Sequence, residues 1–408
     1  MMIDVEEARR LVRQRALRFG GVEQCPLGML AGRVLAGDVV APFGLPRFTN
    51  SAMDGFAVRW EDIEGCTPEC PVMLRVTDDI PAGSSASGQL TQGTAARIMT
   101  GAPLPAGADT VVPFEFTSGF EGEEVTVFRL PSRNGNVRYA GEEIPEGERV
   151  LLEGSVVSPS EIAVLASLGY DSVSVCTLPA LSVVVVGDEL QSPGEGVSDA
   201  EIYDSNSFML QAACRSIGIE PCSVRHAVDD RVAVSSALAA AMAEADLVVS
   251  VGGISTGEYD FVREELERLG VSQHFWTVAQ KPGKPVYFGS RDGRGVFALP
   301  GNPVSALVCF MEYVVPAIML MQGRAEPGRL QAVLDSPFPA DRKRYRFLPG
   351  RLREEDGRLF CSVTEKIESH MISSLVGSNC IIECSPSAEP LPAGSLVFCS
   401  QLPWAGLL

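Results

Sequence analysis

Two closely spaced lysines are the first residues in this chain whose spacing suggests chemistry. They lie in the run Lys281-Pro282-Gly283-Lys284-Pro285, and only two other lysines occur in 408 residues, although Lys and Arg together number 33. The prolines stiffen the backbone and the glycine leaves one permissive joint. Because lysine presents a compact, strongly hydrated point charge, this run predicts a local anion-binding site.

A second stiff turn follows the lysine pair and has features that also suit an anion. It reads Pro300-Gly301-Asn302-Pro303-Val304-Ser305. Asn302 and Pro303 fit the N-cap and the first position of a helix. Ser305 then lies in the first turn, where backbone N–H groups and the helix dipole favour negative charge.

Acidic residues follow several of the strands predicted upstream of these two turns, in the region that begins at residue 181. Strands and helices alternate over residues 181–321, which predicts a doubly wound, mostly parallel sheet. Ligands bind such sheets beyond the carboxyl ends of the strands. The polar and glycine residues expected there are Glu189, Asp229, Gly252, Gly253 and Asp260. Acids beside lysines suit a phosphate-bearing ligand, since carboxylates hold Mg²⁺ and lysines bind oxyanions.

Each of these residues also has a simpler interpretation. Asp229 fits the start of a helix, where acids favour the dipole, and Asp260 fits an N-cap. The glycine pair alone is a weak turn signal, and the two lysines fit solvated surface charges. The convergence of acids, lysines and a helix start at one predicted sheet edge favours a ligand site.

The composition limits the class of protein. With 46% hydrophobic and 21% charged residues the chain is globular, and its length predicts two to four domains. A net charge of -19 argues against a nucleic-acid partner. Eleven scattered cysteines and three histidines predict reduced thiols rather than a zinc site. The N-terminus has no signal-peptide core and no apolar run approaches ~20 residues, so we expect a cytoplasmic protein with no membrane span.

The elements expected to position these residues fall into several predicted segments. A helix is predicted over residues 4–18, with Asp4 as its N-cap. Short β-type runs punctuated by Gly, Pro and Ser predict a β-rich insertion. The predicted domains are a split N-terminal and linker domain (1–45 and 140–178), the insertion (46–139), the α/β domain (179–327) and a C-terminal β domain (328–408).

Several long stretches of the chain together resemble one family. The insertion carries a dense polar stretch over residues 47–57, which taken alone reads as a turn, and a second stretch over residues 97–102. The matching motifs are Thr49-Asn50-Ser51-Ala52-Met53-Asp54-Gly55-Phe56-Ala57, Arg97-Ile98-Met99-Thr100-Gly101-Ala102, Gly187-Asp188-Glu189-Leu190, Gly252-Gly253-Ile254-Ser255-Thr256-Gly257-Glu258-Tyr259-Asp260, the lysine run and the Pro300 turn. In order, over about residues 4 to 400, they resemble the molybdopterin molybdenumtransferase family, which includes MoeA and the gephyrin E domain.

The resemblance implies a fold and a reaction. The implied fold is an α/β and β multidomain protein, with a doubly wound parallel-sheet molybdopterin-binding domain, two smaller β-rich domains and a split α/β linker domain. The implied reaction inserts molybdate into adenylyl-molybdopterin (molybdopterin-AMP) and releases AMP, with Mg²⁺ as the metal. A homodimer with a shared active site is implied, supplied with its substrate by molybdopterin adenylyltransferase.

The resemblance also implies roles for individual residues. Asp54 and Thr100 would reach across the dimer to the partner's α/β domain. Glu189, Asp229 and Asp260 would bind the ligand and its metal. Lys281, Lys284 and Ser305 would hold molybdate or phosphate oxygens. The other implied ligand-binding residues are Gly252, Gly253, Ser255, Pro300, Gly301 and Asn302.

Some positions depart from the family pattern, and two alternatives stay open. Thr277 stands where many relatives have Lys, Glu143 where Asp is usual, and Pro349 where Arg often precedes Gly; Glu368-Ser369-His370 replaces a Gly-Ser start. The alternatives are a non-catalytic molybdopterin-binding scaffold and a paralogue that inserts tungstate. Because a buried carboxylate without its metal has a cost, the retained acids favour the enzyme.

Overall fold

The computed structural model describes residues 2–16, 21–254 and 261–405. The chain forms two compact units. One comprises residues 1–23, 32–34 and 175–408, and the other comprises residues 24–31 and 35–174. The division into four domains, with the boundaries given above, stays a prediction.

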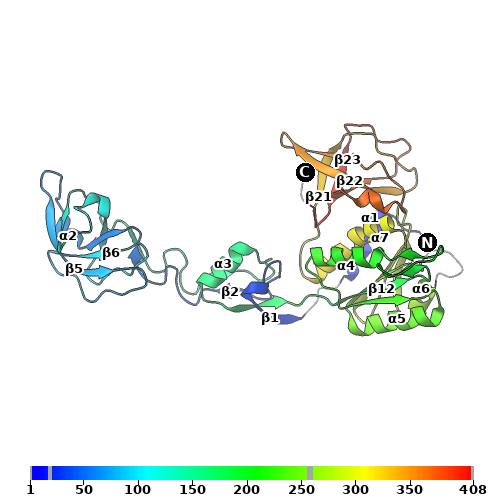
Figure 1. Ribbon diagram of the computed structural model, residues 1–408, viewed down its shortest axis with the longest axis horizontal. Coiled ribbons are helices and arrows are strands. Elements are labelled where there is room, and N and C mark those ends of the chain that lie inside the picture. The colour runs from blue at the N-terminus through cyan, green and yellow to red at the C-terminus, as the bar shows by residue number, and fades with distance from the viewer. Residues whose placement is uncertain (1, 17–20, 255–260, 406–408) are drawn as a thin grey trace. The chain divides into compact units, whose positions relative to one another are not determined.

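A six-stranded sheet forms the centre of the first unit (Figure 1). Its order is β15-β12-β16-β20-β19-β17. The first four strands are parallel, and β19 and β17 add an antiparallel edge. The strands are β12 (Leu181–Val186), β15 (Ser223–Ala227), β16 (Leu247–Val251), β17 (Ser272–Thr277), β19 (Pro285–Arg291) and β20 (Arg294–Leu299). The predicted doubly wound sheet of the molybdopterin-binding domain is confirmed.

Helices cover both faces of this sheet, as Figure 1 shows. Alternate residues of β12 point to opposite faces: Val183 and Val185 join one core cluster, and Val184 and Val186 join another. The first cluster packs against α1 (Val5–Arg15), α4 (Asn206–Ser216), α7 (Pro303–Cys309) and α8 (Val315–Met321). The second packs against α5 (Arg231–Glu244) and α6 (Val262–Arg268).

Two sequence-based expectations about this unit were wrong or incomplete. Strand β17 was not predicted, because its sequence Ser-Gln-His-Phe-Trp-Thr has no regular alternation and lies at an antiparallel edge that only its partner β19 defines. The helical stretch Pro303–Met321, with a π segment at Phe310–Val314, is 19 residues long and apolar enough to cross a membrane by length and composition. Because 83% of its apolar window is buried, it fits a helix of the protein core.

The C-terminal part of the same unit is a small closed barrel. Strand β22 pairs with β23 on one side and β24 on the other, so the order β22-β23-β21-β25-β24 returns to β22. The strands are β21 (Arg329–Leu334), β22 (Tyr345–Glu355), β23 (Arg358–Val363), β24 (Cys380–Cys384) and β25 (Leu396–Gln401). Phe338, Leu348, Leu352 and Ile382 are core residues of the barrel. Two residues of the α/β part, β18 (Gln280–Lys281), extend this sheet beside β22.

The second unit contains the β-rich insertion. Its five-stranded sheet has the order β7-β4-β6-β5-β8. The strands are β4 (Gly55–Val58), β5 (Val72–Ile80), β6 (Thr94–Ile98), β7 (Thr110–Pro113) and β8 (Glu124–Val127), with α2 (Trp60–Ile63) beside them. Residues 47–57, which alone read as a turn, end in the buried strand β4, which lies between β7 and β6. This short strand was not predicted, because the Gly, Asp and Ser residues beside it are typical of turns.

Short ladders complete the rest of this region. Strand β3 (Asn50–Ser51) pairs with β9 (Val137–Arg138), and β2 (Val39–Val40) pairs with β10 (Arg149–Leu151). Strand β1 (Val22–Pro26) pairs with β11 (Ser172–Cys176), and α3 (Pro159–Ser167) precedes β11.

Candidate functional site

A large cavity lies at the carboxyl edge of the central sheet. Its volume is about 870 Å³, which is within the range of ligand pockets. Ten of the residues singled out in the sequence line it: Glu189, Asp229, Gly252, Gly253, Lys281, Lys284, Pro300, Gly301, Asn302 and Ser305. The parallel topology explains this arrangement, since it brings the ends of β12, β15, β16 and β20 to one edge.

The two described acids of the cavity follow neighbouring strands. The backbone N–H of Asp229 donates to Oδ1 of Asp188 at 2.8 Å, and the backbone N–H of Asp188 donates to Oδ2 of Asp229 at 3.2 Å. This reciprocal pair ties the turn after β12 to the turn after β15. Glu189 follows directly, and its backbone carbonyl accepts from Ile202 at 2.7 Å, which orders the short ladder of β13 (Leu190–Gln191) and β14 (Ile202–Tyr203) beside the cavity.

Glycine is required where backbones come together at the cavity. Gly252 has φ +91°, and a Cβ on it would overlap the carbonyl oxygen of Val186. Gly283 has φ +83°, and a Cβ there would overlap Sγ of Cys309 and Nε2 of Gln280. The glycines of these two turns therefore allow close packing of protein groups in the cavity wall. The expectation from the sequence that they let a ligand approach the backbone stays a prediction.

A buried glutamine holds the backbone of the lysine run through hydrogen bonds. Gln280 is fully buried, and its Nε2 donates to the carbonyl of Pro282 at 3.0 Å. The hydroxyl of Tyr313 donates to Oε1 of the same glutamine. These bonds hold the backbone of the turn while Lys281 is half-buried and Lys284 is exposed on the cavity.

The turn before α7 differs in one respect from the sequence-based expectation. Asn302 occupies the N-cap position, but its side chain makes no capping bond. Its Nδ2 instead donates to Oγ of Ser369 at 3.1 Å, and the backbone N–H of Val304 donates to the carbonyl of Ser369 at 3.2 Å. A loop of the barrel therefore takes one of the donors expected for an anion. Ser305 lines the cavity and is 4% exposed.

The barrel contributes cavity residues that the sequence analysis did not single out as ligands. Arg344, Arg346, Ser369 and His370 all line the cavity. Oδ2 of Asp341 accepts from Arg344 at 2.7 Å and 3.0 Å, and this bond lowers the pKa of Asp341 to about 2. Burial lowers the pKa of Arg346 below its ordinary value. No local motif marked these residues. The pairing of β22 with β18 brings Arg346 to the lysine run, and the hydrogen bond with Asn302 brings Ser369 to the Pro300 turn.

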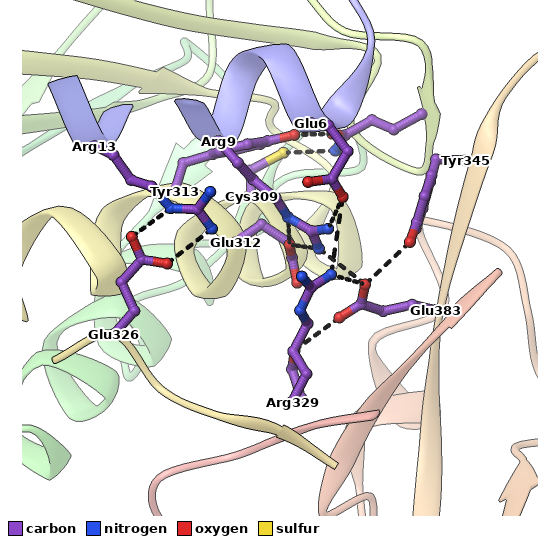
Figure 2. A network of polar contacts seen from close by, with 12 residues as sticks. Glu6, Arg9, Arg13, Cys309, Glu312, Tyr313, Glu326, Arg329, Tyr345 and Glu383 are labelled. Atoms are coloured by element: carbon purple, nitrogen blue, oxygen red, sulfur yellow. Dashed lines mark hydrogen bonds and ion pairs between the residues drawn. The ribbon is translucent and has the colours of Figure 1, made fainter. Parts of the chain in front are cut away.

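A network of buried charges lies behind this wall (Figure 2). The Arg9 guanidinium lies 2.5 Å from Glu312 and 2.9 Å from Glu383. Oε2 of Glu383 also accepts from Arg329 at 3.3 Å and from the hydroxyl of Tyr345 at 3.3 Å. Burial raises the pKa of Glu312 to about 7, against the lowering effect of Arg9. The network joins α1, the π segment and the barrel.

Asp54 and Thr100 form a separate polar pair in the second unit. Oδ1 of Asp54 accepts from both the backbone N–H and the hydroxyl of Thr100, each at 2.7 Å. The backbone bond and then the hydroxyl bond lower the pKa of this exposed carboxyl. The structure thus brings together two residues that lie 46 positions apart and that only the family resemblance had linked.

The metal assignment has two described members. Glu189 and Asp229 line one cavity, whereas Asp260 and Ser255 lie outside the described residues. Within residues 2–16, 21–254 and 261–405, no group of three or more His, Cys, Asp or Glu residues could hold a metal ion. Mg²⁺ usually takes one or two carboxylates together with substrate phosphates and waters, so the two acids fit the protein's share of such a site.

Comparison with known families matches nearly the whole chain. Residues 3–169 match the MoeA N-terminal region (domain I and II), residues 182–319 match a probable molybdopterin binding domain, and residues 331–402 match the MoeA C-terminal region (domain IV).

Individual relatives agree with this assignment. The chain is 37% identical over 404 residues to molybdopterin molybdenumtransferase 2 of Mycobacterium tuberculosis, covering 97% of this chain and 98% of the relative. It is 33% identical over 407 residues to molybdopterin molybdenumtransferase of Haemophilus influenzae, with the same coverage. Among solved structures, the molybdopterin biosynthesis MoeA protein of Pyrococcus horikoshii matches with a TM-score of 0.84 at 29% identity, covering 98% of this chain and 99% of that one. With its doubly wound domain, its barrel and its full-length relatives, this chain belongs to the molybdopterin molybdenumtransferase family, the MoeA proteins of molybdenum cofactor biosynthesis.

Proposed function

We propose that this protein inserts molybdate into adenylyl-molybdopterin and releases AMP, which makes it a molybdopterin molybdotransferase. The observation that supports this most directly is the composition of the cavity wall. Two acids, two lysines and the start of α7 meet at the carboxyl edge of one doubly wound sheet. That set combines groups for an oxyanion and groups for a phosphate-bound cation in one cavity.

The two lysines and the two acids of the cavity are expected to bind different parts of the substrates. Lys281 and Lys284 attract oxyanions that the net charge of -19 would otherwise repel. Glu189 and Asp229 lie at the ends of β12 and β15, where they would hold Mg²⁺. When bound, the metal would neutralise phosphate charge.

The proposal includes a homodimer with a shared active site. Asp54 and Thr100 belong to a different compact unit from the cavity, and we assign them to the cavity of the partner subunit. The two hydrogen bonds that Thr100 donates to Asp54 lower the pKa of its carboxyl, which suits a group that would contact a cation or a donor on the partner's ligand. We further propose that the protein works in the cytoplasm and receives its substrate from molybdopterin adenylyltransferase.

A transfer assay tests the reaction. The protein is incubated with adenylyl-molybdopterin, Mg²⁺ and either molybdate or tungstate, and AMP and metal in the pterin product are quantified. AMP release coupled to molybdenum in the product is the expected result. Tungsten incorporated in preference to molybdenum supports the tungstate alternative. Tight pterin binding without AMP release supports the non-catalytic scaffold and contradicts the proposal.

A mixing experiment tests the shared site. Chains carrying Asp54→Ala and chains carrying Lys281→Ala are each expected to be impaired as homodimers. If the site is shared, mixed dimers contain one site free of both substitutions, so mixing after dissociation should restore part of the AMP release. A mixture no more active than the two separate variants would show that each subunit works alone.

A further inference from the structure

Arg346 is buried without the partners that a buried charge normally requires. Its exposure is 7%. Its Nε atom has no hydrogen-bond partner within the described parts of the chain, and no carboxylate there forms an ion pair with its guanidinium. Asp341 and Glu368 act on Arg346 only through their charge. A buried cation that lacks a partner is costly, so its retention in this wall calls for a ligand that completes it.

The sheet register places Arg346 beside Lys281. Strand β18 pairs in parallel with β22, with Gln280 opposite Tyr345 and Lys281 opposite Arg346, and the backbone N–H of Tyr345 donates to the carbonyl of Ala279 at 2.8 Å. Opposed residues on neighbouring strands project to the same side, ~4.8 Å apart across the ladder. Both members of the second pair line the cavity. Two cations are thus held side by side at its edge.

The side chains of the first pair of this ladder bind other protein groups, although Gln280 also lines the cavity. Successive residues of a strand point to opposite faces. Tyr345 binds Glu383 in the network of Figure 2, and Gln280 binds Tyr313 and the turn after it. The first pair therefore holds the ladder in place, and the second pair presents two charges to the cavity. Arg344, the other arginine of the wall, is neutralised by Asp341, so it does not compete for the same role.

We propose that Arg346 and Lys281 together bind a doubly charged tetrahedral oxyanion, as one subsite of the cavity. The planar guanidinium supplies a fixed pair of donors, and the ammonium supplies a rotatable one. The subsite suits either free oxyanion or a phosphate group of the nucleotide-pterin ligand. The identity of these two sources rests on the proposed function, whereas the binding of an anion does not.

Binding measurements on the full chain without any pterin test the assignment. The probes are molybdate, tungstate and sulfate alone, and AMP alone, each titrated by equilibrium dialysis or calorimetry. The variants are Arg346→Met, which keeps most of the apolar stem, and Arg346→Lys, which keeps the charge. Arg353→Met is the matched control, because Arg353 lies further along β22 in a half-exposed ion pair with Asp335 outside the cavity.

We expect Arg346→Met to weaken binding of one probe class by roughly tenfold or more, Arg346→Lys to recover part of it, and Arg353→Met to change nothing. Loss confined to the free oxyanions assigns the subsite to them, and loss confined to AMP assigns it to the ligand's phosphate. Wild-type affinity of Arg346→Met for all probes overturns the proposal.

Thermal unfolding separates binding from a structural role. Removing an uncompensated buried charge should leave the melting temperature of Arg346→Met equal to or above that of the wild type, while molybdate raises it less than in the wild type. A large fall in the melting temperature of Arg346→Met identifies a structural arginine and overturns the proposal. An inactive wild type in the transfer assay that still binds anions through Arg346 would contradict the proposed function and leave this subsite intact.

Discussion

Two arginines of almost equal burial have opposite surroundings in this protein. Arg9, 6% exposed, lies against Glu312 and Glu383 and over the rings of Tyr345 and Phe347. Arg346, 7% exposed, lies between those two aromatic residues in the sequence but faces the cavity, where its Nε has no partner within the described residues.

The difference shows that burial alone does not tell whether a charge serves stability or binding. The charged groups around Arg9 have protein partners without any ligand. Arg9 donates to the carboxylates of Glu312 and Glu383, and the Tyr345 hydroxyl donates to Glu383. The Arg346 region is complete only when an anion is present. One strand, β22, separates the two regions, and the alternation of its side chains decides which residue belongs to which.

The largest effect is expected from a substitution in the Arg9 region. Arg9→Met leaves Glu312 and Glu383 buried without their shared cation, and we expect the free energy of unfolding to fall by ~3–5 kcal/mol. Urea denaturation at neutral pH measures it. The matched control is Arg10→Met on the same helix, because Arg10 is exposed and binds Glu7 and Gln14 at the helix surface, so a loss within ~1 kcal/mol is expected. Equal losses in the two variants would show that the network contributes no more than a surface pair.

An intermediate effect is expected from a substitution in the Arg346 region, at Lys281. Lys281→Ala should raise the molybdate concentration for half-maximal turnover by roughly tenfold or more, as a charge-assisted bond of ~1.5–3 kcal/mol is lost. Binding of adenylyl-molybdopterin should weaken less, and the melting temperature should stay unchanged. Lys343→Ala is the control, since Lys343 is an exposed lysine outside the cavity. An unchanged molybdate dependence for Lys281→Ala would leave this lysine as a solvated charge.

The smallest expected effect is a change in how the stability of the Arg9 region depends on pH. Burial raises the pKa of Glu312 from 4.5 to about 7. Between these values the folded state holds the Glu312 proton that the unfolded state releases, so this residue makes stability fall as pH rises through the window. Glu312→Gln removes the titrating group and should flatten that fall.

Melting temperatures of the wild type and of Glu312→Gln, measured from pH 5 to pH 8, check this prediction. The other titrating groups are common to both proteins, so the difference between the two curves reports Glu312. Parallel curves would mean that Glu312 stays ionised across the whole range.

The α/β domain and ten of the residues that line the cavity could be predicted from local features of the chain. Glu189 and the Pro300 turn follow β12 and β20, whose apolar runs are local features of the chain, whereas Asp229 follows the mixed strand β15. The topology of parallel sheets then brings those strand ends to one edge. Asp4 as the N-cap of α1 is local in the same sense, since its Oδ1 accepts from the backbone of Glu7 at 2.8 Å.

The residues that complete the cavity wall depend on contacts between distant parts of the chain. Arg346 reaches the lysine run through strand pairing, and Ser369 reaches the Pro300 turn through a loop contact, each across more than 60 positions. No local pattern specifies such a register. The same holds for Arg9, which meets Glu312 and Glu383 after separations of 303 and 374 residues. Periodicity and turn chemistry act between neighbours in the chain, whereas the partner of a buried charge is chosen by packing between distant segments.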